Sequence, residues 1–205
     1  MAVNSRAITR LDAANYARAR QTLGRAFFAY NLMVYVAADN ARRRRGATTV
    51  YGSILADSFR HGEVYITEDG TGVACWLPPG CGVPGLWRQI RAGMLAIPLQ
   101  FGPVGFRRLV AYDNASRNMH HAHAPMPHWY LFAIGVEPEC QGQGIGSLLL
   151  SHMTARADAA GAPCYLDTHQ AQNVRLYERH GFVVAERRTP AGHPIPVWAM
   201  VRRPR

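Results

Sequence analysis

Residues 140–153 read CQGQGIGSLLLSHM, in which three glycines occupy alternate positions directly before a run of leucines. Glycine has no Cβ, so it lets backbone amides approach a ligand closely and accepts positive φ without steric cost. A helix N-terminus adds unpaired N–H groups and the positive end of the helix dipole. A glycine loop that leads from a buried strand into a helix therefore predicts an anion pocket, with phosphate as the favoured guest.

Two common phosphate motifs are absent from this stretch. It contains no GxxxxGK[ST], which argues against a P-loop, and the spacing of Gly142, Gly144 and Gly146 is not GxGxxG. A dinucleotide-binding unit would also place its glycines early in the chain. The loop is therefore neither of these.

The composition is that of a packed domain. The 205 residues are 48% hydrophobic and 18% charged, and we expect one domain over residues 1–205. A net charge of +10 favours anionic partners such as nucleic acid, anionic lipid or a phosphorylated cofactor. The basic clusters ARRRRG (41–46) and VRRPR (201–205) lack interleaved aromatic residues or a recognition motif, so we predict no specific nucleic-acid binding.

Several features predict a cytoplasmic protein. The N-terminal stretch lacks the apolar core of a signal peptide, and no run of eighteen apolar residues occurs, which predicts no membrane span. The four cysteines form no CxxC pair or regular framework, and we interpret them as reduced thiols.

The order of predicted elements indicates an α/β fold with a mixed sheet. Alternating, helical and turn patterns predict a strand at 5–12, a helix from Asp12 to about Tyr30, and a helix after the arginine run to about Gly62. A hairpin over 63–80 with a turn at 68–70 follows, then a helical insertion of two or three short helices at about 84–120. The rest reads as a buried strand (128–136), a helix ending at Gly161, a strand (163–169), a helix ending at Gly181 and a final hairpin turning near 191–192.

Three motifs together resemble the GNAT N-acetyltransferases. Residues 141–146 (QGQGIG) fit the acetyl-CoA loop pattern Q/R-x-x-G-x-G/A, VEP (136–138) fits the end of the preceding strand, and NVRLYERHGF (173–182) fits a later family motif. The resemblance implies a mostly antiparallel central sheet flanked by helices, with a V-shaped opening beside the glycine loop. Within the family, these stretches and RAFFAY (25–30) look like puromycin N-acetyltransferase and its actinobacterial relatives. The likeness to this subgroup indicates the branch of the fold more strongly than it indicates the substrate.

The resemblance also implies a site for acetyl-CoA, with CoA as the product. Strand backbone around Ile134, Gly135 and Val136 would pair with the pantetheine amides, an arrangement available to an open strand edge. Asn173 would bond the pantetheine or cap its helix. The pyrophosphate would lie on the amides of the glycine loop, which are those of Gln141, Gly142, Gln143, Gly144, Ile145 and Gly146, with Ser147 just behind. The alternative is that this loop binds no phosphate and is a tight turn that merely needs glycine.

Acetyl transfer by direct attack in a ternary complex needs a neutral amine, an oxyanion donor and a proton for the departing thiolate. Tyr177 matches the general acid of the family. The strand position where many members keep a Glu or His is Tyr130, which is no base at neutral pH. We expect Glu137 to point to solvent. Our hypothesis is therefore deprotonation through water, assisted by Tyr30 or His128.

Four histidines cluster in MHHAHAPMPHW: His120, His121, His123 and His128. HxH spacing on a loop can bind a metal, but no carboxylate or cysteine lies alongside, so we expect no functional metal. We predict that this loop forms part of the wall around the acceptor.

The predicted function is acetyl-CoA-dependent N-acetylation of a primary amine on a small molecule, and the basic surface would suit acidic acceptors. The alternatives are a peptide or protein N-terminal or lysine acetyltransferase, a non-catalytic CoA-binding module, and a basic nucleic-acid-binding protein. The apolar stretch from Leu86 to Val110 would cover the acceptor pocket or form a dimer contact, so a monomer and a homodimer both remain open.

Overall fold

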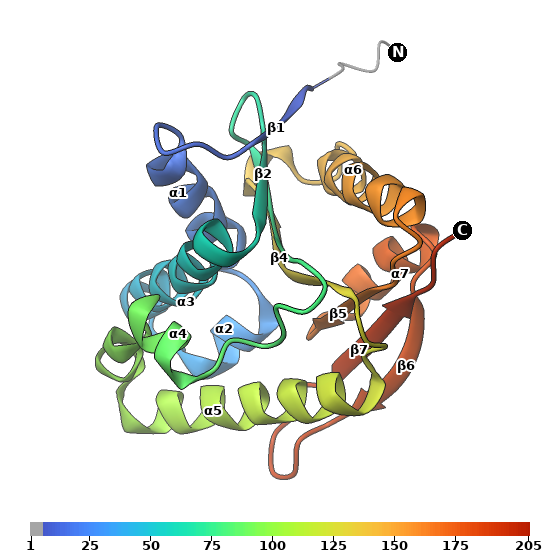
Figure 1. Cartoon of the computed structure of the whole chain (residues 1–205). Helices are drawn as coiled ribbons and strands as arrows, with labels where there is room; N and C mark the ends of the chain where they lie inside the picture. The colour runs from blue at the N-terminus through green and yellow to red at the C-terminus, as the bar shows by residue number, and fades with distance from the viewer. Residues whose placement is uncertain (1–5) are drawn as a thin grey trace.

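The computed structural model describes residues 6–205, and their strands form one seven-stranded sheet in the order β1-β2-β3-β4-β5-β7-β6 (Figure 1). Neighbouring strands run antiparallel except β4 and β5, which are parallel. The sheet is therefore mixed and mostly antiparallel, as predicted. The strands are β1 (Ile8–Arg10), β2 (Glu63–Thr67), β3 (Gly72–Leu77), β4 (Trp129–Val136), β5 (Cys164–Thr168), β6 (Val183–Arg188) and β7 (Val197–Arg202).

Helices cover both faces of the sheet, with α6 and α7 on one side and α1, α2, α3 and α5 on the other (Figure 1). Successive strand residues point to opposite faces, so Val64 and Ile66 of β2 join one core and Tyr65 joins the other. Within residues 6–205, no helix is both long and apolar enough to cross a membrane. The helices are α1 (Tyr16–Ala26), α2 (Asn31–Val36), α3 (Asn40–His61), α4 (Leu86–Arg91), α5 (Ile97–His123), α6 (Ile145–Ala159) and α7 (Ala171–Arg179).

The parallel strands β4 and β5 separate partway along their length. Their pairing runs only from Trp129–Cys164 to Leu131–Leu166, although β4 continues to Val136. Beyond that point one edge of β4 is without a strand partner, while its other edge stays paired with β3. This separation produces the V-shaped opening that the family resemblance implied.

The first two helices differ from prediction at their ends. α1 ends at Ala26, and the chain turns before α2 begins at Asn31, whereas one helix was expected to about Tyr30. α3 begins before the arginine run, because the Asp39 side chain accepts a hydrogen bond from the Arg42 amide at 2.7 Å and caps the helix. The arginines therefore lie inside the helix, and arginine has a favourable intrinsic helix propensity.

The segment at 84–120 forms α4, the 3-10 turn η1 (Met94–Ala96) and the long helix α5, in place of two or three short helices. Gly102, with φ 67° and ψ 176°, interrupts α5 near its start, and Pro103 follows at a position where a missing N–H costs little. Both predicted hairpins are present, as β2–β3 and β6–β7. That residues 1–205 form a single domain stays a prediction.

Candidate functional site

A cavity of about 150 Å³ lies between the separated ends of β4 and β5. The end of the α1–α2 turn, α3, α5 and α7 supply its other walls. The cavity is therefore built by segments from most of the chain around the place where β4 and β5 separate. Its strand-derived walls include Phe132, Ala133 and Ile134 from β4, and Asp167, Thr168 and the following His169 from β5.

The glycine loop presents open backbone amides at the start of α6. Gly142 and Gly144 have φ of 77° and 82°, a left-handed conformation that glycine adopts without strain. Among residues 6–205, no hydrogen-bond acceptor is found for the backbone N–H groups from Gly142 to Ser147. A Cβ built at Gly146 would meet only Leu176, at 3.6 Å. The loop is therefore shaped as a cradle of amide donors, which suits an anion.

The second half of β4 carries the open strand edge. Ile134, Gly135 and Val136 pair with β3 on one side, and β5 has already separated from the other. A Cβ at Gly135 would lie 3.0 Å from the side chains of Ala26 and Leu23. Close packing of α1 therefore explains this glycine. The N–H of Glu137 donates to the carbonyl oxygen of Thr71, so by strand alternation Gly135 also faces β3, while Ile134 and Val136 direct their backbone groups to the opening.

Two predicted side chains of α7, Asn173 and Tyr177, line the cavity. Tyr177 is 5% exposed, and its burial raises its pKa well above the ordinary value. A phenol in this environment keeps its proton at neutral pH. Gln170 is the N-cap of α7 and Asn173 is the third residue of the helix, so the prediction that Asn173 caps the helix is wrong.

Tyr30, at the start of α2, meets the end of β5 at the cavity wall. Its hydroxyl accepts a hydrogen bond from the backbone N–H of His169 at 2.7 Å and lies 3.3 Å from Nδ1 of the same residue. Burial raises the pKa of Tyr30 to about 12 and lowers the pKa of His169. The buried Nε2 of His169 has no hydrogen-bond partner among the described residues. The neutral imidazole of His169 therefore contacts Tyr30 at the cavity wall. This residue was not predicted from the sequence.

Asp167, on β5, is a second cavity residue that was not predicted from the sequence. The hydroxyl of Tyr130 donates to its Oδ1 at 2.9 Å, and that of Ser116 donates to Oδ2 at 3.0 Å. The position at which a base was sought therefore holds a tyrosine that supports a carboxylate from the next strand. The available signal was a charged residue inside the apolar segment YLDTH (165–169), since a buried charge is costly unless it is used.

The structure does not bring His128 to the cavity. Its Nδ1 lies 2.7 Å from the carbonyl oxygen of Pro125, and its ring packs against His120 with centroids 4.9 Å apart. Burial lowers the pKa of His128 and lowers that of His120 to about 4. His120, His121 and His123 lie on the last turn of α5, so the predicted loop at the acceptor wall is wrong. Residues 6–205 contain no group of three or more His, Cys, Asp or Glu placed to hold a metal ion.

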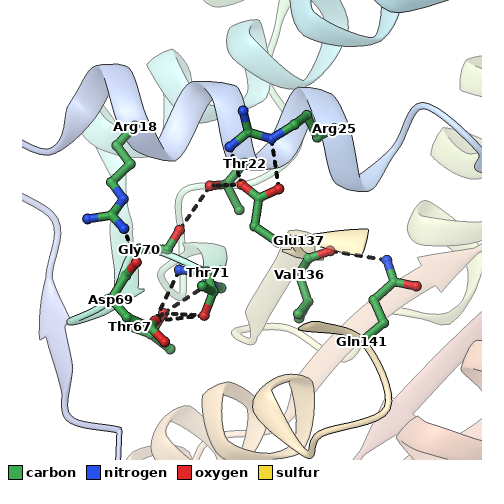
Figure 2. Close-up of polar contacts among 11 residues, drawn as sticks. Arg18, Thr22, Arg25, Thr67, Asp69, Gly70, Thr71, Val136, Glu137 and Gln141 are labelled. Atoms are coloured by element: carbon green, nitrogen blue, oxygen red, sulfur yellow. Dashed lines mark hydrogen bonds and ion pairs between the residues drawn. The ribbon is translucent and has the colours of Figure 1, made fainter. Parts of the chain in front are cut away.

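Glu137, expected to face solvent, is instead buried at the end of β4. Its Oε2 accepts a hydrogen bond from Nε of Arg25 at 2.7 Å, and its Oε1 accepts one from the hydroxyl of Thr22 at 2.7 Å (Figure 2). The Arg25 hydrogen bond is the main cause that lowers the pKa of Glu137. On the loop side, the amide of Gln141 donates to the carbonyl oxygen of Val136 at 3.1 Å. These contacts fix the strand end, and with it the loop, to α1.

Comparisons with known proteins agree with this geometry. Residues 100–184 match the model of a family described as acetyltransferase (GNAT) domain. An uncharacterized N-acetyltransferase of Schizosaccharomyces pombe is 25% identical over 206 residues, covering 97% of this chain and 83% of the relative.

Two solved structures have the same fold. One, from Corynebacterium glutamicum, is described as histone acetyltransferase HPA2 and related acetyltransferase, with a TM-score of 0.70, 22% identity and coverage of 98% of this chain and 97% of the other. Arylalkylamine N-acetyltransferase 2 of Aedes aegypti has a TM-score of 0.59 and 13% identity, covering 98% and 99%. The architecture described above is therefore the GNAT fold.

Proposed function

We propose that this chain, whose residues 100–184 match a GNAT acetyltransferase domain, transfers the acetyl group of acetyl-CoA to a primary amine of a small molecule. One observation carries the proposal: the glycine loop, whose amides have no acceptor among residues 6–205, directly follows the open edge of β4, and that edge borders a cavity lined by Tyr177. The pyrophosphate of acetyl-CoA would lie on the amides from Gly142 to Ser147, and its pantetheine along β4.

The amine attacks the acetyl carbon directly in a ternary complex. A C–N bond forms, the C–S bond breaks, and the departing sulfur takes a proton from the hydroxyl of Tyr177, which the proton leaving the amine replaces. The raised pKa of Tyr177 keeps the phenol protonated until the thiolate develops. Backbone N–H groups at the end of β4 would stabilise the oxyanion.

A primary amine is protonated at neutral pH, so one proton must leave before the attack, and it passes through water toward the wall formed by Tyr30 and His169. The second proton, released as the acetamide forms, is the one that returns to Tyr177. The raised pKa of Tyr30 keeps its hydroxyl protonated, so Tyr30 is not itself the base, but its hydroxyl contacts an imidazole that is neutral at pH 7 and can accept a proton. His128 lies outside the cavity wall, which leaves Tyr30 as the better placed of the two residues predicted to assist.

The experiment is thiol release from acetyl-CoA with a panel of small primary amines and N-terminal peptides, for the wild type and Tyr177→Phe. We expect turnover with small amines, and a fall in kcat of about 100-fold in Tyr177→Phe, the usual contribution of a general acid. The KM for acetyl-CoA should change little, because the phosphate cradle is intact.

The matched control is Tyr165→Phe. Tyr165, on β5, is buried like Tyr177, but it does not line the cavity and its hydroxyl has no hydrogen-bond partner among the described residues. Its kcat should stay within about twofold of wild type. Preference for peptides would support the macromolecular alternative, and a Tyr177→Phe variant with normal kcat would remove Tyr177 as the acid.

A further inference from the structure

Asp167 is a cavity carboxylate without a countercharge. The other one, Asp113, forms an ion pair with Arg117, with Nε and Oδ2 2.7 Å apart. Asp167 receives one hydroxyl hydrogen bond on each oxygen, from Tyr130 and Ser116, and within residues 6–205 it has no cationic partner. Two neutral donors orient the carboxylate but leave its charge in place.

The cavity therefore differs in charge from the rest of the molecule. The chain has 23 lysine and arginine residues, yet no residue of either kind is found on the described wall of the cavity. Burial and then the charge of Asp167 raise the pKa of Tyr130 well above its ordinary value, as expected where negative charge is weakly screened. A cation gains energy on entering this space, and an anion loses it.

The remaining walls are aromatic and apolar. Phe27 stacks on Tyr51 with centroids 3.5 Å apart, and Tyr30 meets Phe27 edge to face at 5.2 Å. Tyr112 and Phe132 complete an aromatic lining. Aromatic faces attract ammonium groups and pack well against flat apolar groups.

We propose that the acceptor is a cationic amine with an aromatic or other flat apolar body and no carboxylate beside the amine, and that its ammonium group pairs with Asp167 on binding. This inference rests on the proposed function and narrows its substrate class. It replaces the expectation of acidic acceptors, because the basic surface does not extend into the cavity. In the full reaction, R–NH3⁺ and acetyl-CoA give the acetamide, CoA thiol and one proton released to solvent.

The test compares 2-phenylethylamine with phenylalanine, which carries the same ring and amine plus a carboxylate. We expect the wild type to favour 2-phenylethylamine by about 100-fold or more in kcat/KM. Asp167→Asn should raise the KM for 2-phenylethylamine by about 30-fold or more, because the bound ammonium group would lose its hydrogen-bonded countercharge. Asp39→Asn, the same change at the exposed N-cap of α3, where asparagine also caps and which does not line the cavity, should raise the KM for 2-phenylethylamine less than about threefold.

Calorimetry of acetyl-CoA and of 2-phenylethylamine, measured separately, distinguishes the two proposals. Failure to bind acetyl-CoA would overturn the proposed function. Normal acetyl-CoA binding with equal use of both amines, or with an unchanged amine KM in Asp167→Asn, would overturn only the role of Asp167. The comparison of the two amines uses the wild type, so it stands even if the Asn variant folds poorly.

Discussion

The three alternating glycines of the loop differ in why glycine is needed. Gly142 and Gly144 have positive φ, so any other residue there strains the backbone, whatever space is available. Gly146 lies in the first turn of α6 with ordinary helical geometry and has room for a methyl group beside Leu176. Nothing in the protein itself requires glycine at this position, which leaves ligand approach as the reason.

Gly146→Ala should therefore separate stability from binding. We expect the free energy of unfolding to rise by about 0.5 kcal/mol, because alanine loses less backbone entropy in a helix. The Kd for acetyl-CoA should rise about tenfold, because the methyl group would occupy space beside the phosphate. Urea melts without ligand and calorimetry with acetyl-CoA measure the two effects. Unchanged affinity would mean that the phosphate does not approach Gly146.

At the residue scale, motif residues were predictable and their supporting partners were not. Tyr177 and Asn173 came from a recognisable string, and both line the cavity. Asp167 and His169 stood in a segment that reads as a buried strand, and sequence spacing does not show that Tyr30, 139 residues earlier than His169, contacts it. Such contacts depend on how distant elements meet.

At the element scale, the link between α1 and the end of β4 makes a pH-dependent contribution to stability. The folded pKa of Glu137 lies below its ordinary value of 4.5, chiefly through its hydrogen bond with Arg25. The unfolded chain therefore takes up the proton first as pH falls. The stabilisation is complete above the unfolded pKa and is lost as pH falls through the folded pKa.

Glu137→Gln should accordingly lower Tm at pH 7 and have a much smaller effect at low pH, where the wild-type carboxyl is also protonated. Thermal melts of both proteins from pH 7 down to about pH 3 would measure this, since the pKa is depressed. Glu139→Gln, at an exposed carboxylate two residues away, is the matched control and should leave Tm unchanged. A Tm difference that is constant with pH would show that packing, and not the charge, is what Glu137 contributes.

The helical segment after β3 shows why element boundaries were harder to predict than element types. Its many Gly and Pro residues suggested several breaks, but only Gly102 leaves helical geometry inside α5. Gly105 keeps helical geometry. A Cβ at this position would lie 2.7 Å from the carbonyl oxygen of Val36, so glycine is needed here to let the end of α2 approach α5. A glycine used for packing and a glycine used for a break look the same in the sequence.

At the scale of the whole molecule, the fold was predictable because strand, helix and hairpin patterns occurred in an order that matched a glycine-loop family. The charge distribution was not, because it depends on which side chains the fold brings to the cavity. Net charge suggested acidic acceptors, whereas the described cavity wall carries two aspartates and no arginine or lysine. The positive surface would therefore attract acetyl-CoA, whereas the negative cavity would attract the amine.

This division predicts opposite salt dependences for the two substrates. Acetyl-CoA is an anion attracted by a surface of net charge +10, so its KM should rise several-fold between about 20 mM and about 300 mM salt as the attraction is screened. The cationic amine is repelled by the same surface and binds the half-buried carboxylate of Asp167, which salt screens less. Its KM should therefore stay constant or fall. Steady-state kinetics with each substrate varied in turn would measure both trends, and a parallel rise of the two KM values would contradict the separation of charge between surface and cavity.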